Sequence, residues 1–185
     1  MIYAWGITDK GAVRAQNQDS YYLKSVEDEL VTALVCDGMG GALAGDVASS
    51  LAVEVASAYL ESLGKEELRQ APGEHLTRVI NLSNDAVYRK AVNDPQCAGM
   101  GTTMVAVIAD GRDLQIVNIG DSRAYRVGEE GIIKVTRDHS VVEDLVSRGE
   151  ITREEARLHP RKNLITRCLG AESKAQPDLY EVKMN

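Results

Sequence analysis

Residues 104–119 read MVAVIADGRDLQIVNI, and this stretch decides the fold that the sequence predicts. Two apolar runs, at 104–109 and 114–119, flank the turn signal Asp110-Gly111. A connection this short cannot hold a crossover helix, so the two runs must pair as an antiparallel hairpin. The sequence therefore predicts an antiparallel sheet.

Outward from this hairpin, short apolar runs bounded by turn residues recur on both sides. They predict further strands at residues 2–8, 20–24, 30–36, 123–127, 132–135 and 178–183. The runs at 123–127 and 132–135 are close enough to form a second hairpin.

Helical spacing of apolar residues marks two long segments between the early and the late strands. Residues 46–63 and 76–91 show this spacing, and Asp46 stands where an N-terminal cap is expected. The charged stretch between them predicts a linker. Shorter helices are expected at residues 141–147 and 153–158. These elements predict an α+β fold in which helices pack on the faces of antiparallel sheets.

The bulk properties are those of a single soluble domain covering residues 1–185. No apolar run approaches the roughly 20 residues that cross a bilayer, so no membrane partner is expected. The three cysteines (Cys36, Cys97 and Cys168) lack paired spacing, and the N-terminus lacks the features of a signal peptide. Free thiols in a reducing, cytoplasmic compartment are therefore expected. A net charge of −7 without a lysine- or arginine-rich block argues against a nucleic-acid partner.

The segment VCDGMGG at residues 35–41 carries one carboxylate from an apolar run into a glycine-rich turn. Asp37 and nearby backbone carbonyls are the oxygen ligands that Mg²⁺ or Mn²⁺ prefers, and glycine lets the backbone approach an ion closely. A glycine-rich strand-to-helix turn with an acidic cap has the same pattern. This motif alone leaves both interpretations open.

Four other segments carry side chains suited to chemistry: RAQNQD at 14–19, GMGTT at 99–103, NIGDSR at 118–123 and TRDHS at 136–140. Arg14 offers a planar guanidinium that suits a phosphate, and Asp19 suits the surroundings of a cation. A solvated loop arginine and a strand cap are the structural alternatives. The glycines and threonines of 99–103 favour tight packing and satisfaction of buried polar groups. Asp121 fits a turn, and His139 fits a base, a ligand or a packing residue.

Several common chemistries are excluded by missing residues. Residues 40–45 have the glycine spacing of a P-loop, but Asp46 occupies the position of its lysine. Leu43 occupies the third glycine position of a dinucleotide-binding motif. No cysteine is followed by the arginine of a cysteine-dependent phosphatase, and no G-x-S-x-G motif indicates a serine hydrolase.

Taken in order, these segments resemble the metal-dependent protein phosphatases, the protein phosphatase 2C family, in their bacterial form. The motifs that carry the resemblance are R-x-x-N-Q-D at 14–19, D-G-M-G-G at 37–41, G-M-G-T-T at 99–103, N-I-G-D-S-R at 118–123 and D-H-S at 138–140, followed by Arg148-Gly149, His159-Pro160 and Leu169-Gly170.

The resemblance implies a two-sheet antiparallel β-sandwich flanked by helices, an αββα arrangement. It also implies a serine/threonine protein phosphatase, in which a water bridging two Mg²⁺ or Mn²⁺ ions removes phosphate from phosphoserine or phosphothreonine. Bacterial members use a third metal site, so two or three ions are expected in a complete domain. The implied partners are a phosphorylated protein and a cognate serine/threonine kinase.

Carried over by position, the resemblance gives roles to five residues. Asp37 would bridge the metals, and the Gly38 carbonyl would bind one of them. Arg14 would hold the substrate phosphate, Asp19 would belong to the metal shell, and Asp121 would serve the third metal site. Residues of about 140–169 would form a flap beside the active site.

The resemblance also implies residues that are missing here. Family members continue with an S-D-G and a D-N motif, each supplying a metal carboxylate, and neither motif occurs after Gly170. We therefore expect a domain that lacks its last strands and a 185-residue chain that is inactive or nearly so. Gln18 replaces a common glutamate, and Met39 replaces a histidine proposed as general acid in animal members. The alternatives are a non-catalytic module that binds phosphoproteins or regulates a kinase, and an enzyme for other phosphate esters.

Overall fold

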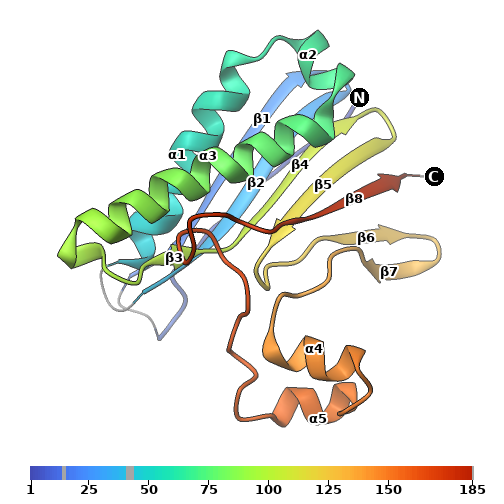
Figure 1. Cartoon of the computed structure of the whole chain (residues 1–185). Coiled ribbons are helices and arrows are strands. Elements are labelled where there is room, and N and C mark those ends of the chain that lie inside the picture. The colour runs from blue at the N-terminus through green and yellow to red at the C-terminus, as the bar shows by residue number, and fades with distance from the viewer. Residues whose placement is uncertain (14–15, 41–43, 185) are drawn as a thin grey trace.

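Figure 1 shows the computed structural model, which describes residues 1–13, 16–40 and 44–184. Its elements in chain order are β1 (Asp19–Glu27), β2 (Leu30–Met39), α1 (Gly45–Ser62), α2 (Lys65–Gln70), α3 (Pro72–Asn93), a short 3-10 helix η1 (Pro95–Cys97), β3 (Gly101–Thr102), β4 (Met104–Asp110), β5 (Asp113–Ile119), β6 (Tyr125–Gly128), β7 (Gly131–Lys134), α4 (Val141–Ser147), α5 (Arg153–Leu158) and β8 (Asp178–Lys183).

The main sheet has the strand order β1-β2-β4-β5-β8, and β3 pairs with β2 beyond this path. Every pairing is antiparallel, which confirms the sheet type predicted from residues 104–119. Strand β4 turns into β5 through the pair Asp110↔Asp113. The second predicted hairpin is β6–β7, a separate two-stranded sheet. The α+β class, with antiparallel sheets flanked by helices, is thus confirmed.

The core lies between the main sheet and the helices α1 and α3, which cover one face of the sheet (Figure 1). Alternate residues of β2, including Leu34 and Cys36, are buried against these helices, as the two-residue period of a strand requires. Small residues on α1 let α3 approach closely, and the hydroxyl of Ser83 in α3 donates to the carbonyl of Ala52 in α1 at 3.1 Å. This packing joins α1 and α3 into one helical layer over the sheet.

Three local predictions are wrong. Residues 2–8 form no strand, and this segment instead contacts β1, where the Tyr21 hydroxyl donates to the Gly6 carbonyl at 3.3 Å. The N-terminal cap of α1 is Ala44, and Asp46 lies inside the first turn. The charged linker contains helix α2, which begins where the Glu67 carboxylate accepts the Gly64 amide hydrogen at 2.8 Å.

The segment with helices α4 and α5 projects from the rest of the molecule (Figure 1). Its two ends are held together by an isolated bridge between Ser140 and Ile165. The Val141 amide also donates to the Leu164 carbonyl at 2.9 Å. We name residues 140–165 the α4–α5 excursion. No helix in the described part of the chain combines the length and the apolar character needed to cross a membrane.

Candidate metal and phosphate site

Two of the predicted metal-site aspartates lie directly opposite each other on neighbouring strands. Asp19 at the start of β1 is paired with Asp37 near the end of β2. Both line a pocket of about 380 Å³ whose other lining residues are Ile7, Thr8, Asp9, Ser20, Tyr21, Val35, Cys36, Ser122 and Arg123. Like charges that face each other across a strand pair are destabilising, and a bound cation reverses that effect.

The backbone of Asp37 is held on both sides by the threonines of the GMGTT segment. The Asp37 amide donates to Thr103 Oγ1 at 3.0 Å, and the Thr103 amide donates back to the Asp37 carbonyl at 3.0 Å. The Thr102 hydroxyl also donates to that carbonyl, at 3.0 Å. Thr103 Oγ1 lies 2.7 Å from the hydroxyl of Ser122. The threonines therefore satisfy buried polar groups, as predicted, and connect Asp37 to the turn that contains Asp121.

Gly38 lies where β2 meets the beginning of α1. Its amide donates to the Gln18 carbonyl at 2.9 Å. A Cβ atom at this position would be 1.8 Å from the carbonyl oxygen of Gly45 and 2.8 Å from that of Gln18. This close approach of backbones explains the glycine by packing, and it holds the Asp37 turn against helix α1.

Asp121 follows a tightly held turn. Gly120 has a φ of +107°, which few residues other than glycine adopt. Two hydrogen bonds join Gly120 to His139. The Gly120 amide donates to His139 Nδ1 at 3.1 Å, and the His139 amide donates to the Gly120 carbonyl at 2.9 Å. Nδ1 is thus an acceptor, so Nε2 carries the proton toward Asp178 Oδ2, 3.1 Å away. Buried His139 therefore matches the packing interpretation.

The site residues match a hard divalent cation in kind, because carboxylates and carbonyls are the donors such ions prefer. The number of these donors, however, fits such an ion only in part. Within residues 1–13, 16–40 and 44–184, no three histidine, cysteine, aspartate or glutamate side chains gather closely enough to hold a metal. Asp121 therefore does not join Asp19 and Asp37 in one cluster. The predicted phosphate ligand, Arg14, lies outside the described residues.

Arg123 and Asp138 form an ion pair beside the pocket that sequence reasoning missed. Arg123 Nη2 lies 2.6 Å from Asp138 Oδ2, and Lys134 Nζ lies 3.0 Å from Oδ1. Burial acts to raise the pKa of the Asp138 carboxyl, but the hydrogen bonds from Arg123 and Lys134 outweigh it, so the pKa lies below its ordinary value. The dipeptide Asp138-His139 forms no local pattern that would predict an ion-pair partner 15 residues earlier in the chain.

The substitution Asp138→Asn keeps the size of this side chain and removes its charge. We expect the free energy of unfolding to fall by about 1–3 kcal/mol near neutral pH, the usual effect of losing hydrogen bonds between charged groups. Because the folded-state pKa is lowered, the stabilisation is present above the unfolded pKa of about 3.9 and is lost as pH falls through the folded value. Urea unfolding of both proteins across this pH range measures the difference.

The control for this prediction is Asp85→Asn, at an exposed position of α3. It should leave stability unchanged at every pH. The role given to the ion pair would be contradicted if the two substitutions lowered the free energy of unfolding equally. It would also be contradicted if the loss in Asp138→Asn did not decrease as the pH falls.

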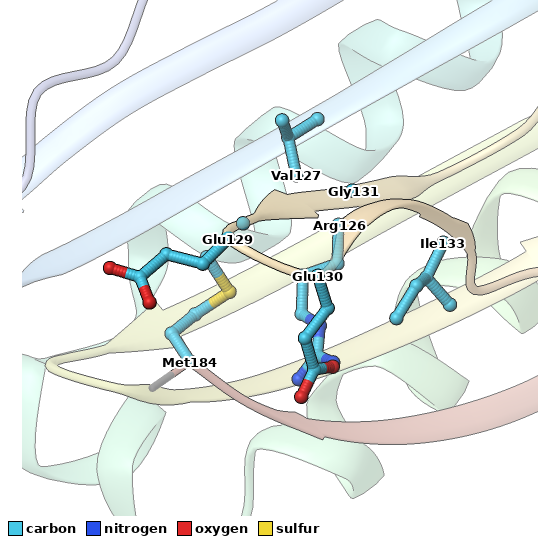
Figure 2. Close-up of a pocket in the computed structure, with 8 residues that line it drawn as sticks. Arg126, Val127, Glu129, Glu130, Gly131, Ile133 and Met184 are labelled. Atoms are coloured by element: carbon cyan, nitrogen blue, oxygen red, sulfur yellow. The ribbon is translucent and has the colours of Figure 1, made fainter.

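The Cys36 thiol and a second pocket do not provide reactive groups for the site. Burial raises the pKa of the Cys36 thiol, which opposes its use as a nucleophile. A separate pocket of about 360 Å³ lies between the β6–β7 hairpin and the end of β8, where Figure 2 shows Glu130 and Met184 among the lining residues. None of the predicted site residues lines it.

Comparisons with known proteins show which family the chain resembles. A family model described as protein phosphatase 2C matches residues 11–161. The serine/threonine phosphatase Stp of Listeria innocua is 38% identical over 179 residues, covering 95% of this chain and 69% of the relative. The phosphatase PstP of Mycobacterium tuberculosis is 38% identical over 162 residues, covering 88% of this chain and 30% of the relative.

Solved structures show the same likeness. The crystal structure of Stp1 from Staphylococcus aureus superposes with a TM-score of 0.90 at 36% identity, covering 97% of this chain and 70% of that one. A structure of the PstP catalytic domain in complex with two manganese ions has a TM-score of 0.74 at 34% identity, covering 95% and 70%. This chain therefore belongs to the protein phosphatase 2C family, whose bacterial relatives are serine/threonine phosphatases.

Proposed function

We propose that the protein acts, as part of a complete catalytic domain, in the hydrolysis of phosphoserine and phosphothreonine with Mg²⁺ or Mn²⁺. The observation that supports this most is the direct pairing of Asp19 with Asp37 in one pocket. Bound divalent ions would lower the pKa of water and neutralise phosphate charge. A relative whose structure is described with two manganese ions supports the choice of metal.

In this proposal each residue has a defined task. Asp37 is the shared metal ligand, and Thr103 and Thr102 hold its backbone in place. The Gly38 carbonyl is a second ligand, Asp19 contributes through water or hydrogen bonds, and Asp121 serves a further ion. Arg14 binds the substrate phosphate.

The proposed setting follows from the family and the composition. The substrate is a phosphorylated protein, the opposing enzyme is a cognate serine/threonine kinase, and the compartment is the cytoplasm. Three free cysteines agree with a reducing compartment. The α4–α5 excursion, continued to about residue 169, is the proposed flap.

We also propose that the 185-residue chain by itself releases phosphate no faster than its Asp37→Ala variant. The two facing carboxylates are too few to hold a pair of divalent ions at ordinary affinity. The measurement is phosphate release from a phosphothreonine peptide with Mn²⁺ present, on protein of verified mass. Turnover well above that of Asp37→Ala would overturn this proposal and support full catalytic competence.

A non-catalytic, phosphoprotein-binding module is the second candidate. It is favoured by the lack of a three-member metal cluster among the described residues. The two candidates differ in metal dependence, because a module of this kind should bind a phosphopeptide equally well with Mn²⁺ and with a chelator.

A further inference from the structure

The hydroxyl of Ser122 lies in the pocket of the two facing aspartates and has no task in the proposed function. Ser122 belongs to the connection between β5 and β6 and lines the same pocket as Asp19 and Asp37. Its neighbour Asp121 is not among the described residues that line this pocket. The NIGDSR segment therefore reaches the pocket through Ser122 and Arg123.

The hydrogen bond between Thr103 and Ser122 has a direction that its surroundings determine. Thr103 Oγ1 accepts the Asp37 amide hydrogen at 3.0 Å, and its other partner in the described part of the chain is Ser122 Oγ, at 2.7 Å. Thr103 is only 1% exposed, so its hydroxyl hydrogen cannot reach solvent, and leaving it unpaired would be costly. Thr103 therefore donates its hydrogen to Ser122.

This direction leaves the hydrogen of the Ser122 hydroxyl available to a ligand. A hydroxyl has one hydrogen and two acceptor positions, and Ser122 Oγ receives a hydrogen from Thr103 while keeping its own. Within the described residues, Thr103 is the one side chain bonded to the Ser122 hydroxyl. Ser122 is partly exposed and lines the pocket. The chain of bonds from the Asp37 amide through Thr103 also polarises Ser122 as a donor.

Three other donors that line the pocket are engaged elsewhere. The Arg123 guanidinium forms the buried ion pair described above. The Tyr21 hydroxyl donates to the Gly6 carbonyl at 3.3 Å. The Ser20 hydroxyl lies 3.1 Å from that of Ser49. Ser122 thus differs from them in being fixed by a buried partner while its own hydrogen stays free.

We propose that the Ser122 hydroxyl donates a hydrogen bond to an oxygen of the substrate's phosphoryl group, beside the divalent ions held by Asp37. This rests on the proposed function and adds a substrate-binding residue to it. A phosphate oxygen is an ionised acceptor, and hydrogen bonds to ionised acceptors are shorter and stronger than neutral ones. The cations are needed as well, because Asp19 and Asp37 alone would repel a phosphate.

Titration of inorganic phosphate with the whole chain, followed by ³¹P NMR, tests this with Mg²⁺ and with a chelator. The Mn²⁺ affinity of the same proteins is measured separately by electron paramagnetic resonance. The variant Ser122→Ala removes the proposed donor, and Thr103→Val removes the acceptor of the Asp37 amide. The matched control is Ser62→Ala, which removes an exposed hydroxyl at the end of α1.

We expect Ser122→Ala to bind phosphate about tenfold more weakly with Mg²⁺ present, since a hydrogen bond to a charged acceptor contributes at least this much. Its Mn²⁺ affinity should equal that of wild type, because the Asp37 amide keeps its bond to Thr103. Thr103→Val should weaken the binding of both ligands, and Ser62→Ala should weaken neither.

Three results would overturn the proposal. Wild type could fail to bind phosphate with Mg²⁺, Ser122→Ala could bind phosphate as tightly as wild type, or Ser122→Ala could lose Mn²⁺ affinity as Thr103→Val does, which would make its role structural. The Mn²⁺ affinity of Asp37→Asn separates this proposal from the proposed function. If that variant and wild type bind Mn²⁺ equally, the proposed function fails whatever the phosphate titrations show.

Discussion

The substitution Gly38→Ala is expected to destabilise the protein by about 3 kcal/mol, the upper end of the usual effect of over-packing. The added Cβ would lie 1.8 Å from the Gly45 carbonyl oxygen and 2.4 Å from its carbon. These are backbone atoms at the start of α1, so no side chain can rotate away. The strand end must move from the helix and give up the bond between the Gly38 amide and the Gln18 carbonyl. Urea unfolding measures the loss.

Gly128 provides the matched control for this prediction. It lies in β6, and a Cβ there would meet no atom within 4 Å. Gly128→Ala should therefore leave the unfolding midpoint close to that of wild type. A midpoint for Gly38→Ala that equals the one for Gly128→Ala would show that the contact between β2 and α1 is looser than described.

The substitution Asp37→Asn is expected to weaken Mn²⁺ binding roughly tenfold or more, since even an outer-shell partner of a metal site commonly contributes that much. Asparagine keeps the shape of the side chain and leaves the backbone bonds to Thr103 in place. The loss would therefore reflect the missing charge rather than a changed fold. Electron paramagnetic resonance of free Mn²⁺ measures the affinity.

Asp113→Asn is the control for the metal experiment, because Asp113 is an exposed residue at the far end of β5 from Asn118 and Ile119. It should leave Mn²⁺ binding unchanged. Equal affinity of Asp37→Asn and wild type would remove Asp37 from the metal site and, with it, the main support for the proposed reaction.

The sheet and the late helices could be predicted from the sequence because their signals are local. The turn Asp110-Gly111 determines the β4–β5 hairpin, and the bounds of α4, α5 and β8 coincide with the predicted ranges. Each of these elements is bounded by residues that end regular structure.

The errors have tertiary causes. Residues 2–8 show a strand-like pattern, yet no described strand pairs with them. Helix α2 is only six residues long, too short for apolar periodicity, and it is fixed by burial of Leu68. Asp46 fits a cap by residue type, but the chain enters α1 two residues earlier, at Ala44.

The sequence could name candidate site residues but not their geometry. Motif order proposed Asp37 and Asp19, and only the strand register shows that they face each other. The bond between Thr103 and Ser122 joins residues 19 apart, and the Arg123–Asp138 pair joins residues 15 apart. Such contacts depend on packing that no local pattern encodes.

The central claim is that divalent cations bind between Asp19 and Asp37. Paramagnetic broadening of backbone amide signals by added Mn²⁺ tests it most directly, because broadening decays steeply with distance from the ion. The account predicts that the signals of Asp19, Asp37 and Ser122 broaden at the lowest Mn²⁺ concentrations and that Asp37→Asn abolishes this selectivity. Broadening that begins elsewhere, or that is uniform over the chain, would contradict it.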